Sequence, residues 1–173
     1  MINYLKGDAT VPQAKGTKLI IHVCNSIGGW GRGFVLALSR RWLEPEVMYR
    51  RWYNNRVPIN HPEPGQIVMT SGSFKLGEAQ LVMVKPGLAV VNMIAQEGTK
   101  TGSKGPPIRY DALEKTLNLV NGYADSFKAS IHCPRLGCSL AGGSWAKVEP
   151  LIQKTLGARD VFVYDFENST FNP

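Results

Sequence analysis

The 173-residue sequence has no long hydrophobic run and no secretory signal. Lys, Asn, Gln or Gly interrupts each apolar stretch within several residues, far short of the roughly 20 apolar residues that a membrane-spanning helix needs. Residues 1–6 also lack the basic start and the following apolar stretch of a signal peptide. These absences predict a soluble protein with no membrane partner.

Cysteine is scarce as well, and the chain has only Cys24, Cys133 and Cys138. An odd number of cysteines without a signal peptide favours a reducing compartment, so we expect a cytoplasmic protein. His22, Cys24 and Cys133 could form a nucleophile pair or a metal site, but their spacing matches no metal-ligand pattern. We interpret them as buried strand residues and expect no metal and no cofactor.

Acidic residues are few relative to basic ones, with 13 Asp and Glu against 20 Lys and Arg, which gives a net charge of +7 and a pI near 9.5. This balance favours an anionic partner such as a nucleotide, a nucleic acid or a phosphorylated small molecule. The basic residues are dispersed, which argues against a basic nucleic-acid tail. A basic surface that is merely solvated is the alternative.

The length allows one buried core and is too short for two ordinary domains, so we expect a single domain over 1–173 with a tail at 167–173. Aliphatic runs alternate with helical periodicity, which predicts an α/β fold with a mixed, mostly parallel sheet. Lys85-Pro86-Gly87 predicts a hairpin turn, and Gly157 a left-handed helix end. Expected strands are 2–5, 19–24, 66–70, 79–84, 88–95, 130–133 and 160–166, and expected helices are 34–42, a stretch after Pro45 to about 55, 108–123 and 144–156.

Two glycine-rich loops, 28–33 and 137–144, each join an expected strand to an expected helix. Glycine lets backbone N–H groups approach a phosphate closely, and the helix N-terminus adds donors and partial positive charge. Both loops should face one crevice at the carboxyl ends of the strands. Neither fits a Walker A loop or the dinucleotide fingerprint. The pattern predicts a pyrophosphate site, with tight turns that hold no ligand as the alternative.

Two polar residues stand where ligand contacts are expected. Asp8 follows the first expected strand and can accept a hydrogen bond from an exocyclic amine such as that of adenine. Asn25 lies between a strand and a glycine loop and suits sugar hydroxyls. The alternatives are a turn-capping aspartate and an ordinary turn asparagine.

Five runs resemble, in order, the ligand-binding elements of the macrodomain superfamily. They are 6–8 (KGD), 21–25 (IHVCN), 29–34 (GWGRGF), 133–140 (CPRLGCSL) and 163–166 (VYDF). The resemblance spans nearly the whole chain and is closest to the branch of ADP-ribose 1″-phosphate phosphatases and terminal ADP-ribose protein glycohydrolases. It implies a three-layer α/β/α macrodomain whose ligand is ADP-ribose or ADP-ribose 1″-phosphate, alone or on an ADP-ribosylated protein or nucleic acid.

The resemblance also implies roles for the matching residues. Asp8 would bind the adenine amine beside the backbone of Ala9, and Phe166 would stack on the adenine ring unless it is a core or tail aromatic. Asn25 would hold the distal ribose and is a catalytic candidate, as is His22, although strand alternation places His22 on the other face. The remaining ligand-binding candidates are Gly29, Gly31, Arg32, Gly33 and Phe34 in the first loop and Gly137, Cys138, Ser139, Leu140, Ala141 and Gly142 in the second.

One departure bears on the reaction. The glycohydrolase branch uses a lysine and an aspartate where this chain has Gln96 and Ala141, so its lysine-based mechanism is not expected, although Lys100 and Lys104 lie nearby. The leading hypothesis is a phosphatase acting on ADP-ribose 1″-phosphate. The alternatives are a binding module without turnover and a hydrolase that removes ADP-ribose from protein or nucleic acid. We further expect Gly142→Glu to block the diphosphate without unfolding the domain.

Overall fold

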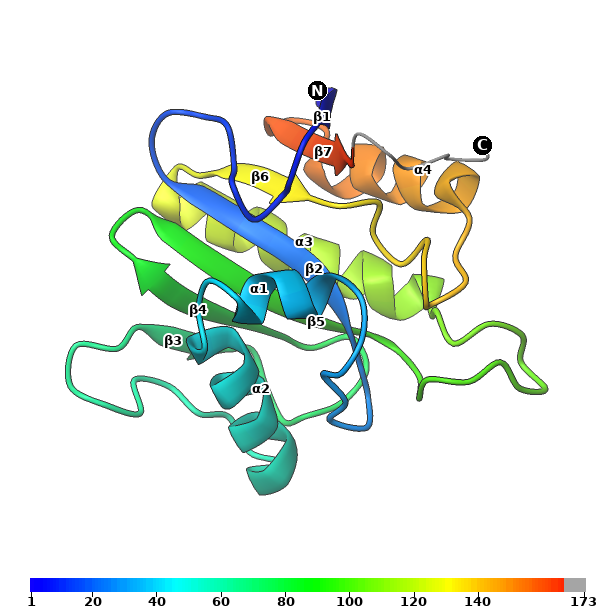
Figure 1. Cartoon of the computed structure of the whole chain (residues 1–173), viewed down its shortest axis with the longest axis horizontal. Helices are drawn as coiled ribbons and strands as arrows, with labels where there is room; N and C mark the ends of the chain where they lie inside the picture. Colours follow the sequence, from blue (N-terminus) through cyan, green and yellow to red (C-terminus); the bar gives the residue numbers. More distant parts are fainter. Residues whose placement is uncertain (167–173) are drawn as a thin grey trace.

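The computed structural model describes residues 1–166, so the expected tail lies outside the described residues. Seven strands form one mixed sheet in the order β1-β7-β6-β2-β5-β4-β3 (Figure 1). The strands are β1 (Ile2–Lys6), β2 (Lys18–Asn25), β3 (Val68–Thr70), β4 (Ala79–Lys85), β5 (Leu88–Gln96), β6 (Ser130–Cys133) and β7 (Val161–Asp165). The expected mixed sheet is therefore confirmed.

The strand directions decide where a ligand site can form. β1, β7, β6, β2 and β5 pair in parallel, whereas β4 and β3 run antiparallel to their neighbours. The carboxyl ends of the five parallel strands therefore meet at one edge of the sheet, the edge where open α/β sheets bind ligands. We refer to it as the carboxyl edge.

Helices cover both faces of the sheet, as Figure 1 shows. α3 (Tyr110–Phe127) and α4 (Trp145–Leu156) pack on one face through a cluster that includes Leu19 and Ile21 of β2. α1 (Phe34–Ser39) and α2 (Glu44–Asn55) pack on the other face, against a cluster with Ile20 and Cys24. Alternate residues of β2 thus face opposite layers, and β2 is buried on both faces.

Several expected element ends are wrong. The helix expected over 34–42 ends at Ser39, because Leu43 already stands at the N-cap position of α2 and only a short turn separates the two helices. α3 begins at Tyr110 and runs on to Phe127, where the left-handed residue is Lys128 (φ 52°) rather than a glycine. β3 begins only at Val68, two residues later than expected.

Gly157 is not the left-handed helix end that the sequence predicts, since its φ is −59°. A Cβ at this position would lie 2.4 Å from the carbonyl oxygen of Gln153, so close backbone approach explains the glycine. The N-terminal ammonium of Met1 also donates to the Gly157 and Arg159 carbonyls, at 3.3 and 2.8 Å.

No helix within residues 1–166 is long and apolar enough to cross a membrane.

Candidate functional site at the carboxyl edge

A cavity of about 590 Å³ opens at the carboxyl edge, where β2, β5 and β6 end. Its volume lies in the range of small-molecule sites, roughly 300 to 1,000 Å³. Both glycine-rich loops contribute to its wall, so the crevice that the sequence predicts exists. It is lined by His22, Val23, Cys24, Asn25, Gly29, Trp30, Gly31, Arg32, Gly33, Phe34, Val35, Gln96, Thr99, Lys100, Pro134, Arg135, Leu136, Gly137, Ser139, Leu140 and Ala141.

The first glycine-rich loop is held from inside the protein. Asn25 Oδ1 accepts a hydrogen bond from the Gly29 N–H (2.9 Å), and Asn25 Nδ2 donates to the Gly29 carbonyl (2.9 Å). The hydroxyl of Tyr49 on α2 donates to the Asn25 carbonyl (2.6 Å). These bonds make Asn25 the anchor of the loop, while Gly31 and Arg32 remain exposed at the cavity.

The second glycine-rich loop curls against the segment that precedes α3. The Gly143 N–H donates to the Gly137 carbonyl (2.7 Å), and the Ile108 N–H donates to the Ala141 carbonyl (3.1 Å). Gly137 has a φ of 65°, and a Cβ there would lie 2.3 Å from Cδ1 of Ile108, so both conformation and space require glycine. The curl turns residues 139–141 toward the cavity.

Gly142 lies on the far side of this loop and does not line the cavity. Its φ is 71°, and a Cβ at this position would lie 2.7 Å from Cβ of Pro106. Any side chain at this position therefore strains the backbone and displaces Pro106. Gly142→Glu is expected to disturb the fold, so the expectation that it selectively blocks binding is wrong.

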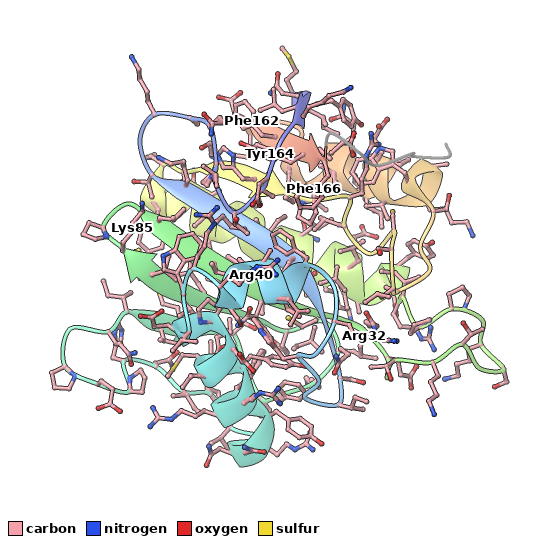
Figure 2. The ribbon with its side chains drawn as sticks, viewed as in Figure 1. Arg32, Arg40, Lys85, Phe162, Tyr164 and Phe166 are labelled. Carbon is pink, nitrogen blue, oxygen red and sulfur yellow. The ribbon has the colours of Figure 1, made fainter. Side chains whose placement is uncertain are left out.

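Five of the predicted ligand-binding residues lie outside the cavity lining: Asp8, Ala9, Cys138, Gly142 and Phe166. Asp8 follows β1 and Phe166 follows β7, and these strands pair side by side with Lys6 opposite Asp165. Phe166 is 55% exposed, and Figure 2 shows it beyond Tyr164 along the chain. Because β7 adjoins β6 and β1 adjoins β7 in the sheet, these residues extend the carboxyl edge beyond the cavity, an arrangement suited to an elongated ligand.

The Asp8 carboxylate is already oriented by its neighbours. Oδ1 accepts hydrogen bonds from the backbone N–H (2.8 Å) and the hydroxyl (2.7 Å) of Thr10. The guanidinium of Arg41 donates to the same hydroxyl (2.7 Å) and lies 3.7 Å from Oδ2 of Asp8. Asp8 therefore makes the hydrogen bonds of a turn-capping aspartate. Its Oδ2 makes one long ion pair and can still accept a hydrogen bond from a ligand.

His22 lines the cavity although alternation alone predicted that it faces away from Asn25. The pairing of β2 with β5 shifts register between Cys24 and Asn25, which breaks strict alternation there. His22 Nε2 lies 2.6 Å from Oδ1 of Asn92, and the Asn92 amide nitrogen donates elsewhere, so Nε2 carries the proton and Nδ1 does not. Burial lowers the pKa of His22 to about 4, which keeps the ring neutral at neutral pH.

His22, Cys24 and Cys133 are buried, as the sequence predicts, and His132 is buried as well. Burial raises the pKa of the Cys24 and Cys133 thiols well above the usual range, which disfavours the thiolate that a nucleophile requires. Among residues 1–166, no group of three or more His, Cys, Asp or Glu could hold a metal ion.

The cavity is basic, since Arg32, Lys100 and Arg135 line it and none of its lining residues is acidic. Arg135 bridges both carboxylate oxygens of Asp165, at 2.8 and 2.7 Å, and this hydrogen bonding lowers the pKa of Asp165. Sequence reasoning gave no role to Thr99 or Arg135, although each follows the end of a strand at this edge. In the sequence Lys100 is a possible substitute for the lysine that Gln96 replaces, and the structure brings Lys100 into the cavity.

Comparison with solved structures decides the family. A macrodomain protein from Streptomyces coelicolor is 44% identical, with a TM-score of 0.78, and the match covers 95% of this chain and 99% of that one. The chain belongs to the macrodomain family. No protein-family model matches the sequence.

Two further similar proteins differ from this macrodomain in total length or in sequence identity. The Chromodomain-helicase-DNA-binding protein 1-like of Danio rerio is 34% identical over 93% of this chain, but the match covers 15% of that much longer protein. DarTG of Thermosipho africanus, solved in complex with ADP-ribose, is 14% identical with a TM-score of 0.64, over 91% of this chain and 40% of that one. At this identity the second likeness shows a shared fold alone.

Proposed function

We propose that this macrodomain binds ADP-ribose and hydrolyses ADP-ribose 1″-phosphate to ADP-ribose and phosphate. The observation that carries the proposal is the cavity itself, where two N–H-bearing loops and the cations Arg32 and Lys100 form a wall with no acidic residue, while Asp165 offsets the charge of Arg135. Such a cavity suits a ligand with several phosphate charges. The resemblance of both loops to macrodomain ligand-binding elements supports ADP-ribose as that ligand.

In the proposed complex the ligand lies along the carboxyl edge. The adenine ring lies at the β1 and β7 end, with its amine on Asp8, the backbone of Ala9 beside it and Phe166 on its face. The second loop holds the diphosphate through N–H groups of Gly137 and residues 139–141, since the N–H groups of Cys138 and Gly142 donate within the loop region. The distal ribose and its phosphate lie between Asn25 and residues 31–34.

The proposed reaction adds water to phosphorus and breaks the phosphorus–oxygen bond. The oxygen stays on the ribose and takes up the proton that water gives to the base, and inorganic phosphate leaves. Arg32 and the loop N–H groups would stabilise the charge on the phosphate oxygens in the transition state. His22 is the candidate base, because the hydrogen bond from Nε2 to Asn92 leaves Nδ1 without a proton. Its pKa of about 4 makes it a weak base, so we expect slow turnover.

Two observations support other functions. The Asn25 amide is committed to the first loop and His22 is a weak base, which favours a binding module without turnover. Lys100 lines the cavity, which favours a hydrolase that removes ADP-ribose from protein or nucleic acid through an amine nucleophile. Gln96 and Ala141, which also line the cavity, argue against that second reaction, because neither side chain can supply the nucleophile or the acid and base.

Phosphate release from ADP-ribose 1″-phosphate distinguishes these functions. We expect slow release by the unaltered protein, no release by Gly31→Glu, and no release of ADP-ribose from a glutamate-modified protein. Binding of ADP-ribose without phosphate release would leave the binding module as the function. Removal of ADP-ribose from the modified protein, lost in Lys100→Ala but kept in the control Lys85→Ala, would instead establish the lysine-based hydrolase.

Asp8→Asn tests the adenine end. Asparagine keeps an oxygen for Thr10, but its amide NH₂ would face the adenine amine, so a donor replaces the charged acceptor. We expect ADP-ribose to bind about 5- to 100-fold more weakly, as for the loss of a charge-assisted hydrogen bond. Calorimetry with ADP-ribose and with ribose 5-phosphate measures this, since the second ligand lacks adenine and should bind both proteins equally. Unchanged ADP-ribose affinity would leave Asp8 as a turn-capping residue.

A further inference from the structure

A second cleft, of about 450 Å³, lies behind the second glycine-rich loop. Residues 139–141 of the loop line the main cavity, whereas Gly142 and Ser144 line this cleft, so the loop is the wall between the two. The hydrogen bond from the Ile108 N–H to the Ala141 carbonyl anchors that wall. The cleft is lined by Lys104, Pro106, Ile108, Arg109, Tyr110, Gly142, Ser144 and Lys147.

The second cleft is basic. Lys104, Arg109 and Lys147 line it, and none of its lining residues is acidic. Glu97 lies 2.8 Å from Arg109 and offsets its charge, but Lys104 and Lys147 form no ion pair within residues 1–166. The Lys147 ammonium lies 5.4 Å from the centre of the Tyr110 ring. Two uncompensated cations therefore remain at the cleft and favour an anion.

Backbone and hydroxyl donors add to this charge. α3 and α4 both begin at the cleft, with Arg109 and Ser144 at their N-cap positions, and neither side chain makes a capping hydrogen bond. The Ser144 hydroxyl normally expected to cap α4 thus remains available to a ligand. Asp111, in the first turn of α3, lies outside the cleft lining. Cations, a hydroxyl and helix N-termini together are the donors that bind phosphate.

We propose that this cleft binds a second phosphate-bearing group of a ligand whose ADP-ribose occupies the main cavity, an inference that rests on the proposed function. The segment 97–106 connects the two sites, because Thr99 and Lys100 line the main cavity and Lys104 lines the cleft. This segment shares the main cavity with Asn25 and residues 31–33, the proposed site of the distal ribose. The ligand class is therefore ADP-ribose extended beyond its distal ribose by a further phosphate group.

Calorimetry at low salt with ADP-ribose and with a two-unit oligomer of ADP-ribose tests the proposal. We expect the oligomer to bind at least about fivefold more tightly than ADP-ribose, since its second diphosphate gains a tethered contact. Lys104→Ala with Lys147→Ala should remove this advantage and change ADP-ribose affinity less than twofold. Lys15→Ala with Lys85→Ala removes the same charge from exposed residues outside both sites and should keep the advantage. Figure 2 shows Lys85 at the hairpin, away from Arg32 at the carboxyl edge.

The outcomes that contradict the proposal are distinct from a failure of the proposed function. Normal ADP-ribose binding with no advantage for the oligomer, or an advantage that survives the Lys104 and Lys147 substitutions, would overturn the role of the cleft alone. Absence of binding by both ligands would overturn the proposed function as well. If inorganic pyrophosphate shifts the amide resonances of residues 104, 105, 108–110 and 142–147 and the oligomer has no advantage, the cleft binds free phosphates and the proposal of an attached ligand is overturned.

Discussion

Gly31→Glu is expected to weaken ADP-ribose binding by at least about 100-fold while leaving the thermal unfolding of the protein unchanged. A Cβ at Gly31 meets no atom within 4 Å, and its backbone is outside the left-handed region, so the fold tolerates a side chain there. Gly31 lines the cavity, so the added carboxylate lies against the proposed ligand. Repulsion between unit charges a few ångströms apart costs about 3 to 4 kcal/mol near a protein surface, or more than two powers of ten in affinity.

Gly122→Glu is the matched control for this substitution. Gly122 is exposed on α3, and a Cβ there also meets no atom within 4 Å, so the charge changes equally at a position outside the cavity. Calorimetry measures binding, and differential scanning calorimetry measures unfolding. Equal ADP-ribose affinity in the two variants would remove the first glycine-rich loop from the binding site.

Asn92→Ala is expected to lower the free energy of unfolding by about 3 kcal/mol or more, because Asn92 is the centre of a buried polar row across three strands. Asn92 is the register partner of His22 on β2 and of Gln80 on β4. Its Oδ1 accepts from His22 (2.6 Å), and its Nδ2 donates to Gln80 Oε1 (3.2 Å) and to the Pro45 carbonyl (3.1 Å). Alanine leaves three buried polar groups without this partner, and each unpaired group costs about 1 to 3 kcal/mol.

The effect of Asn92→Ala should extend to the candidate functional site, because hydrogen bonds connect Asn92 to Asn25 through α2. Asn92 binds the first turn of this helix, Gln80 binds the Met48 carbonyl (3.2 Å), and Tyr49 of α2 holds Asn25. Urea unfolding measures the stability. The control is Asn54→Ala, at an exposed position of α2, whose free energy of unfolding should stay within about 0.5 kcal/mol of that of the unaltered protein. If Asn92→Ala and Asn54→Ala unfold at the same urea concentration, the polar row contributes no net stability.

The sequence by itself predicts the α/β class, most strand positions and the two glycine-rich loops at the carboxyl ends of strands. These features are local, because hydrophobic periodicity and turn residues act over a few neighbouring positions. The hairpin at Lys85-Pro86-Gly87 and the placement of both loops at one edge follow from such local patterns and from the parallel pairing of the strands. Element ends are less predictable, as Gly157 and Lys128 show, because backbone contacts decide them.

Only the tertiary structure decides which residues of those loops face the ligand. Gly31 and Gly142 look equivalent in the sequence, yet one lines the cavity and the other packs against Pro106, a residue 36 positions away. His22 and Asn25 both line the cavity because a register shift between Cys24 and Asn25 breaks strict alternation, and Lys104 and Lys147 line the second cleft from separate segments. The direction of a side chain depends on packing partners distant in the chain, and a local sequence pattern contains no information about those partners.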